Sequence, residues 1–161
     1  MVSALLVGVG MLLISLLTYG VVTALLIHWV VRLLRRDHPG AKVWKNVGVI
    51  IIISLVTALV HLIEIALWAV AFLMCEVTTS FDDAFYISAQ NYTALGYGDY
   101  VFAKTWRLLG PLEAVNGLLL FGLSTAVMFA VLNRLITNRL RHQHDHRSDG
   151  QESPAGKPSG D

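Results

Sequence analysis

Residues 91–100 read NYTALGYGDY, a polar stretch with two glycines that lies between two long apolar segments. These segments cover about residues 46–75 and 111–135, and a third apolar segment covers residues 2–31. Each is long enough for a helix that crosses a bilayer, because such a helix takes about 20 apolar residues. The chain has 161 residues, of which 55% are hydrophobic, more than a soluble domain of this size can bury. We therefore expect an all-α integral membrane protein with three transmembrane helices.

The distribution of basic residues predicts how these helices are oriented. Lysine and arginine are concentrated between the first and second apolar segments and again after the third. The stretch around residues 91–100 carries few of them, and an excess of basic residues marks the cytoplasmic side. We expect a multi-pass protein with its N-terminus outside and its C-terminus in the cytoplasm. The net charge of +1 gives no indication of a nucleic-acid partner.

The segment SFDDAFYISAQNY, residues 80–92, is typical of a short helix. Ser80 stands where a cap is needed, and Asp83 three residues later completes a capping-box pattern. Asp82 and Asp83 also lie where the positive end of the helix dipole favours acids. At 1.5 Å per residue this helix reaches about 20 Å, too short for about 30 Å of hydrocarbon. The sequence therefore predicts a re-entrant helix that stops partway.

The chain must return from this helix through irregular backbone. Inside a membrane such backbone is tolerated only where protein buries it or where it lines water. Gly96 and Gly98 flank Tyr97, and glycine allows left-handed backbone, so successive residues can alternate in conformation and turn their carbonyls the same way. A row of carbonyl oxygens on one side suits the replacement of the hydration shell of a cation.

Two motifs resemble a known family. The stretch TALGYGD (residues 93–99) resembles the selectivity filter of tetrameric potassium channels of the pore-loop type, whose pore is built from two helices. The stretch GLLLFGLSTA (residues 117–126) is similar to the inner helix of simple bacterial members. The first apolar segment is an extra transmembrane helix relative to that pore. The resemblance implies a homotetramer in a bacterial plasma membrane that conducts K⁺ passively through a ring of carbonyls, with no cofactor and no enzyme activity.

The resemblance assigns the filter to Thr93, Ala94, Leu95, Gly96, Tyr97, Gly98 and Asp99. Alanine stands at position 94, where the family usually has threonine, and leucine at 95, where valine is usual. The carbonyl of residue 94 is kept, but a ring of side-chain hydroxyls at the innermost ion position is missing. Two functions therefore stay open: a potassium-selective channel and a cation channel of reduced selectivity.

Other residues would support the filter. By the resemblance, Asp99 bonds to groups on the re-entrant helix, and Tyr86 and Gln90 are the candidates. Glu113 either holds the filter scaffold through that helix or faces the outer vestibule.

The resemblance also assigns a water cavity and a gate along the third apolar segment, at Gly117, Leu118, Phe121, Thr125 and Phe129. Gly117 matches a hinge glycine, and its alternative role is to let two helices approach closely. Phe129 either closes the pore or packs against a neighbouring helix.

His61 and Glu64 lie three residues apart near the middle of the second apolar segment, on one helical face. One interpretation is a proton sensor or a metal-binding pair. The other is an interhelical hydrogen bond, to the first helix or to Asn116, which we expect because two ligands from one helix rarely make a metal site. The first interpretation keeps open a third function, that of a non-conducting accessory or metal-binding membrane protein.

We expect a transmembrane helix at residues 1–34, a basic cytoplasmic connector at 35–45, a pore domain at 46–138 and a disordered cytoplasmic tail at 139–161. Within the pore domain the expected elements are an outer helix at 46–75, a pore helix at 80–92, a filter at 93–99 and an inner helix at 104–138.

Overall fold

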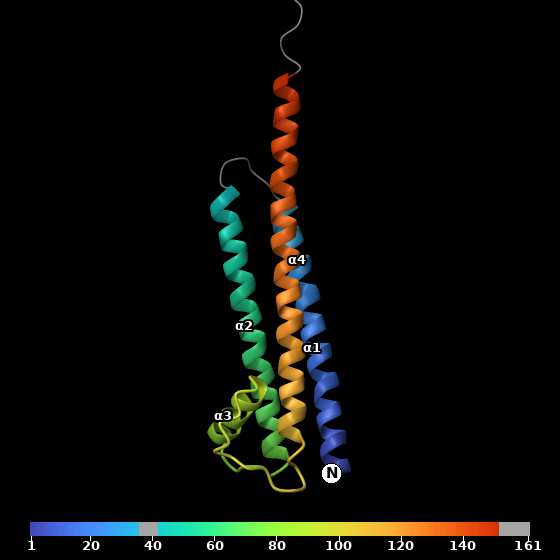
Figure 1. Ribbon diagram of the computed structural model, residues 1–161, viewed down its shortest axis with the longest axis vertical. Helices are drawn as coiled ribbons and strands as arrows, with labels where there is room; N and C mark the ends of the chain where they lie inside the picture. Colours follow the sequence, from blue (N-terminus) through green and yellow to red (C-terminus); the bar gives the residue numbers. More distant parts are fainter. Residues whose placement is uncertain (36–41, 152–161) are drawn as a thin grey trace, which may run out of the picture.

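The computed structural model describes residues 1–35 and 42–151. Within these ranges the chain forms four helices and no strand: α1 (Val2–Arg35), α2 (Lys42–Met74), α3 (Phe81–Tyr92) and α4 (Leu109–Gln151) (Figure 1). Three of them are long and apolar enough to cross a membrane, over Val2–Val30, Val47–Met74 and Leu109–Arg134. The expectation of an all-α, multi-pass membrane protein with three spans is confirmed.

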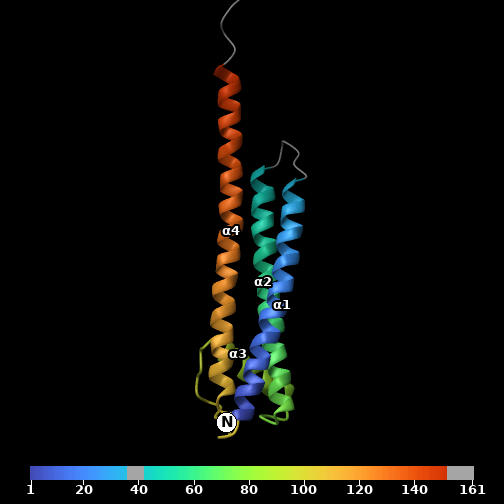
Figure 2. The same cartoon turned by 90° about the vertical axis from the view of Figure 1, so that its right-hand side faces the viewer.

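The three long helices lie alongside one another, and the short α3 sits at one end of the bundle (Figures 1 and 2). α1 and α4 both begin at that end, whereas α2 finishes there. α3 contacts both α2 and α4, and α1 contacts α4 and α2. The short helix is therefore held by α2 and α4, and α1 packs against the same two helices.

α3 begins where the sequence predicts, but without the predicted capping bonds. Ser80 occupies the N-cap position in an extended conformation and makes no side-chain cap hydrogen bond. Its carbonyl accepts a 3.0 Å bond from the Ala84 N–H, and its own N–H donates to Thr78 Oγ1 at 3.4 Å. Asp82 and Asp83 lie in the first turn. The positive end of the helix dipole stabilises acidic side chains there, so these two residues favour a helix that begins at this position.

Three expected boundaries are wrong. α4 begins at Leu109, because residues 104–108 form turns, and it continues to Gln151. The expectation of disorder from residue 139 is thus incorrect for residues 139–151, where neither proline nor glycine occurs before Gly150 to end the helix. Residues 42–45, assigned to the connector, already belong to α2. Residues 36–41 and 152–161, the rest of the connector and of the tail, lie outside the described residues.

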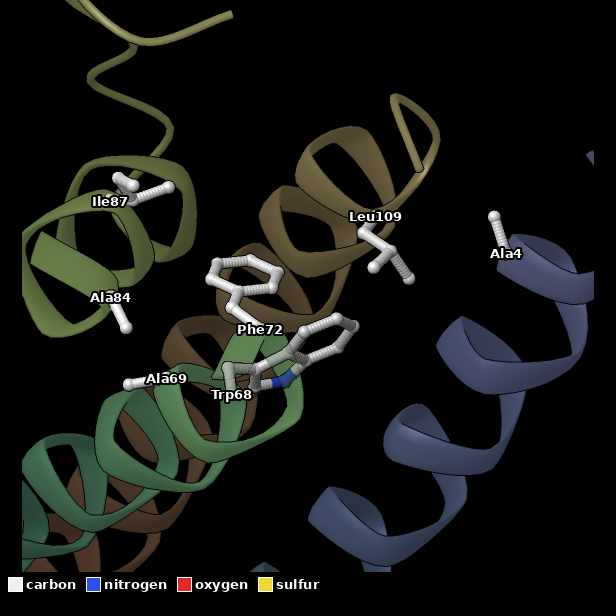
Figure 3. Close-up of a cluster of buried hydrophobic side chains, with 7 residues drawn as sticks. All are labelled: Ala4, Trp68, Ala69, Phe72, Ala84, Ile87 and Leu109. Carbon is white, nitrogen blue, oxygen red and sulfur yellow. The ribbon is translucent and has the colours of Figure 1, made fainter. Parts of the chain in front are cut away.

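A cluster of buried side chains joins all four helices at the α3 end of the bundle, and it consists of Ala4, Trp68, Ala69, Phe72, Ala84, Ile87 and Leu109 (Figure 3). Phe72 is fully buried and meets the Trp68 ring edge-on, with 6.2 Å between centroids. On its other side Phe72 meets Phe102, from the stretch that leads into α4, at 5.4 Å. Helices in a membrane associate through such packing, so this cluster fixes α3 against α2 and α4.

Small residues bring the helices close together. A Cβ at Gly8 of α1 would overlap the side chain of Leu112 on α4. The glycine thus permits the close approach of α1 to α4, as small residues do in membrane interfaces.

Candidate functional site

The loop of residues 93–99, called the filter loop below, leaves α3 through a tight backbone turn. The Thr93 N–H donates to the Ala89 carbonyl at 3.2 Å, and the Ala94 N–H donates to the Asn91 carbonyl at 2.8 Å. The Leu95 N–H then donates to the carbonyl of Gln90 at 2.9 Å. These bonds satisfy the last carbonyls of α3, which have no partner within the helix itself. The start of the filter loop is therefore fixed to the end of α3.

Every second residue of the filter loop has left-handed backbone. The φ angle is 55° at Ala94, 50° at Gly96 and 78° at Gly98. The alternation expected from the two glycines is present, and it extends one step further, to a residue with a Cβ. Left-handed backbone costs a residue with a side chain about 1–2 kcal/mol, so Ala94 holds this conformation only because its surroundings impose it. The alanine side chain gives no sign of left-handed backbone at residue 94. Only the two-residue spacing of Ala94 from Gly96 could have predicted it.

Two side chains of α3 bond to Asp99 at the far end of the filter loop. The Tyr86 hydroxyl donates to Asp99 Oδ2 at 3.0 Å, and Gln90 Nε2 donates to the same oxygen at 3.4 Å. The amide oxygen of Gln90 accepts the Tyr97 N–H at 3.2 Å. Gln90 is buried and bridges the middle and the end of the loop with one side chain. The structure thus brings together the three residues that the sequence grouped.

These bonds set the charge state of Asp99. Hydrogen bonds, first from Gln90 and then from Tyr86, hold the pKa of Asp99 below its ordinary value. The same contact with Asp99 raises the pKa of the Tyr86 hydroxyl. Asp99 is therefore a carboxylate, and Tyr86 a neutral donor, at neutral pH.

Glu113 is a buried acid where α3, α2 and α4 meet. Its Oε1 is in hydrogen-bond contact with Ser88 Oγ on α3, and Ser88 Oγ donates to the Ile65 carbonyl of α2 at 2.7 Å. Ser88 has one hydroxyl proton, so both contacts are satisfied together only when Glu113 carries a proton and donates it. Of the two roles expected for Glu113, the structure shows the contact with the short helix, α3.

The proposed cavity residues divide into two kinds. Leu118, Thr125 and Phe129 are exposed on α4, and no other part of the described chain covers them. Phe121 is also exposed, at 37%, but its ring packs on His61, with 4.5 Å between centroids.

Gly117 is buried against the end of α3, and a Cβ there would overlap the backbone carbonyl of Tyr92. The structure therefore shows the close-approach role for Gly117, and its hinge role stays a prediction.

His61 and Glu64 do not bind each other. The ring nitrogens of His61 bond to Tyr92 OH (Nδ1, 2.8 Å) and to Ser124 Oγ (Nε2, 2.9 Å). Glu64 is fully buried near Ser15 of α1, and neither carboxyl oxygen has a hydrogen-bond partner within the described residues. The expected interhelical hydrogen bond of His61 is present, but its partners are neither on α1 nor Asn116.

Asn116 makes a different interhelical bond. Its Nδ2 donates to Ser15 Oγ at 3.0 Å and so ties α4 to α1. In the part of the chain that the structure describes, no group of three or more metal-binding side chains occurs. Sequence reasoning missed Ser15, Tyr92 and Ser124. The only signal of Ser15 and Ser124 was a polar group inside an apolar span, and Tyr92 ends the short helix α3.

Residues 59–134 match the family model for ion channels. The matched region covers the second half of α2, all of α3, the filter loop and the apolar part of α4, and it leaves α1 outside. The match supports an ion channel domain of the pore-loop type in this region and hence passive ion conduction across a membrane. No curated protein and no solved structure matched the chain.

Proposed function

We propose that four copies of this chain form a potassium-selective channel, in which the filter loops of the four copies line the pore. The observation that carries the proposal is the left-handed backbone at residues 94, 96 and 98. Alternating left- and right-handed residues turn successive carbonyls to one side, and four such strands make rings of oxygens that replace the water around K⁺. One chain supplies one strand, so the functional unit is a homotetramer.

The surroundings of the filter loop support this proposal. Residues 93–100 are exposed in the single chain, so they are accessible to other copies and to ions. The end of α3 carries the negative pole of its dipole, which favours a cation at the inner end of the filter loop. The uncovered side chains of Leu118, Thr125 and Phe129 would line the cavity below. We further propose a bacterial plasma membrane, with the N-terminus outside and no cofactor besides the permeant K⁺.

A cation channel of reduced selectivity is the second candidate, and Ala94 favours it. The residue offers a carbonyl but no hydroxyl at the innermost position, so one ring of ligands is missing. A metal-binding function centred on His61 is disfavoured, since both of its ring nitrogens are already engaged by Tyr92 and Ser124.

Gly96→Ala tests the proposal in liposomes that contain the purified tetramer. Alanine relaxes towards negative φ, which turns the neighbouring carbonyl away, so K⁺ flux should be abolished while native gels still show a tetramer. A Cβ at Gly96 meets nothing within 4 Å of the chain, so the effect comes from the backbone and not from crowding. Gly48→Ala in α2 is the matched control, because its Cβ also meets nothing. Normal K⁺ flux through Gly96→Ala would refute the filter assignment.

A further inference from the structure

His61 lies where three other elements of the protein meet. Its Nδ1 is 2.8 Å from the hydroxyl of Tyr92, the last residue of α3, and its Nε2 is 2.9 Å from Ser124 Oγ on α4. Tyr19 of α1 donates to the same Ser124 oxygen at 3.0 Å. Tyr92 is fully buried and His61 is almost so. Tyr19, His61, Tyr92 and Ser124, called the Tyr92 clamp below, join all four helices.

Counting protons gives the clamp one consistent arrangement. Ser124 Oγ lies 2.8 Å from the Leu120 carbonyl, which can only accept, so the single proton of Ser124 is used there. His61 Nε2 must then carry a proton and donate it to Ser124. With Nε2 protonated, a neutral imidazole accepts at Nδ1, where the Tyr92 hydroxyl donates. Every polar group of the clamp is satisfied by this tautomer.

We propose that His61 is a positioning residue for the filter loop and that it acts by fixing Tyr92. The inference rests on the proposed function, and it assigns part of the selectivity to a residue outside the filter loop. Tyr92 is held at two points, since its carbonyl packs on Gly117 and its hydroxyl bonds to His61. The next residue, Thr93, begins the filter loop.

Two features explain why the position of Tyr92 should affect the selectivity of the filter loop. Ala94 has no side-chain ligand, so the innermost ion site depends entirely on where the backbone carbonyls are placed. Thr93, the first residue of the filter loop, is joined directly to Tyr92, and the N–H groups of residues 93–95 bond to carbonyls in the same last turn of α3, so a shift of this turn at Tyr92 moves the loop carbonyls. Tyr19 brings α1 into the clamp, which gives the additional helix a role in holding the filter.

The test compares K⁺ and Na⁺ flux in liposomes for Tyr92→Phe, Ser124→Ala and His61→Leu. Each removes a bond of the clamp, and the K⁺/Na⁺ flux ratio should fall about fivefold, the size expected for one buried hydrogen bond. His61→Gln keeps an acceptor and a donor, and it should retain most of the ratio. Ser54→Ala is the matched control, because within the described residues Ser54 Oγ bonds only to the carbonyl of Ile50, four residues before it, at 2.9 Å.

Unchanged ratios in Tyr92→Phe and Ser124→Ala, alongside a selective wild type, would overturn the inference and leave the proposed function intact. An equal loss in Ser54→Ala would also overturn it. A wild type without K⁺ flux would instead refute the proposed function. Nitrogen-15 NMR of His61 in the wild-type protein checks the arrangement without any flux, with a neutral ring protonated at Nε2 expected. A proton on Nδ1, alone or on both nitrogens, would contradict the clamp.

Discussion

The filter loop and the Tyr92 clamp are neighbours in the chain, yet they are held in opposite ways. The filter loop is exposed, and its side-chain bonds reach back no further than from Asp99 to Tyr86, 13 residues away. The clamp lies between the helices, and its bonds join residues 31, 63 and 105 positions apart. The shape of the filter loop is thus set by backbone angles and local bonds. The shape of the clamp is set by how the helices pack, so different substitutions should damage the two regions.

Gly117→Ala should have the largest effect, because it disrupts the packing of α4 against Tyr92, a residue of the clamp. The added Cβ overlaps the Tyr92 carbonyl, which is backbone and cannot move aside alone. Overpacking of this kind costs about 1–3 kcal/mol, so we expect a lower melting temperature of the tetramer in detergent and loss of selective flux. Gly122→Ala on the same helix is the control, since its Cβ meets nothing within 4 Å. Equal melting temperatures for the two variants would contradict the close contact.

Gln90→Leu should act on the filter loop alone and should make it sensitive to acid. The pKa of Asp99 is depressed in the folded protein, so the stabilisation from its bonds is present above its ordinary pKa and is lost as pH falls through the folded value. Removing Gln90 takes away the largest cause of that depression. Loss of selectivity should therefore begin at a higher pH than in the wild type, as measured by Na⁺ flux during acidification of the outer solution.

Tyr86→Phe should shift that acid transition in the same direction, because the Tyr86 hydroxyl also holds the pKa of Asp99 down. If Gln90→Leu loses selectivity at the same pH as the wild type, Asp99 is not held by these bonds.

Glu64→Gln should have the smallest effect. The carboxyl group is buried and has no hydrogen-bond partner within the described part of the chain, so the substitution breaks no bond that the structure shows. The amide adds a buried N–H₂ group, for which we expect a loss of about 1 kcal/mol of tetramer stability. The dependence of flux on pH between about 5 and 8 should not change. A steep pH dependence that disappears in both Glu64→Gln and His61→Ala would instead establish a sensor.

The contrast between the two regions also explains what the sequence could predict. The three spans follow from the length of apolar runs. The contacts of Asp99 with Tyr86 and Gln90 were expected from the resemblance, and they join residues within or just after one short helix. The left-handed backbone at Gly96 and Gly98 follows from the absence of a side chain in glycine. All of these depend on neighbours in the chain.

The partners of His61 could not be found in the same way. Ser124 and Tyr92 reach it only because α2, α3 and α4 are rotated so that their polar groups meet, and one sequence does not give that rotation. The role of Gly117 depends equally on where α3 ends against α4. The end of α4 was missed because a polar composition was taken as disorder, although its residues are compatible with a helix.

The relative flux of K⁺, Rb⁺ and Na⁺ through the wild-type protein in liposomes tests the central claim most directly. Rings of carbonyls spaced for K⁺ also accept Rb⁺, which is close to it in size, and they discriminate against the smaller Na⁺. We expect K⁺ and Rb⁺ flux to exceed Na⁺ flux by more than about tenfold, a preference of about 1.4 kcal/mol. Equal flux of all three ions, or no flux at all, would contradict a potassium filter built from residues 93–99.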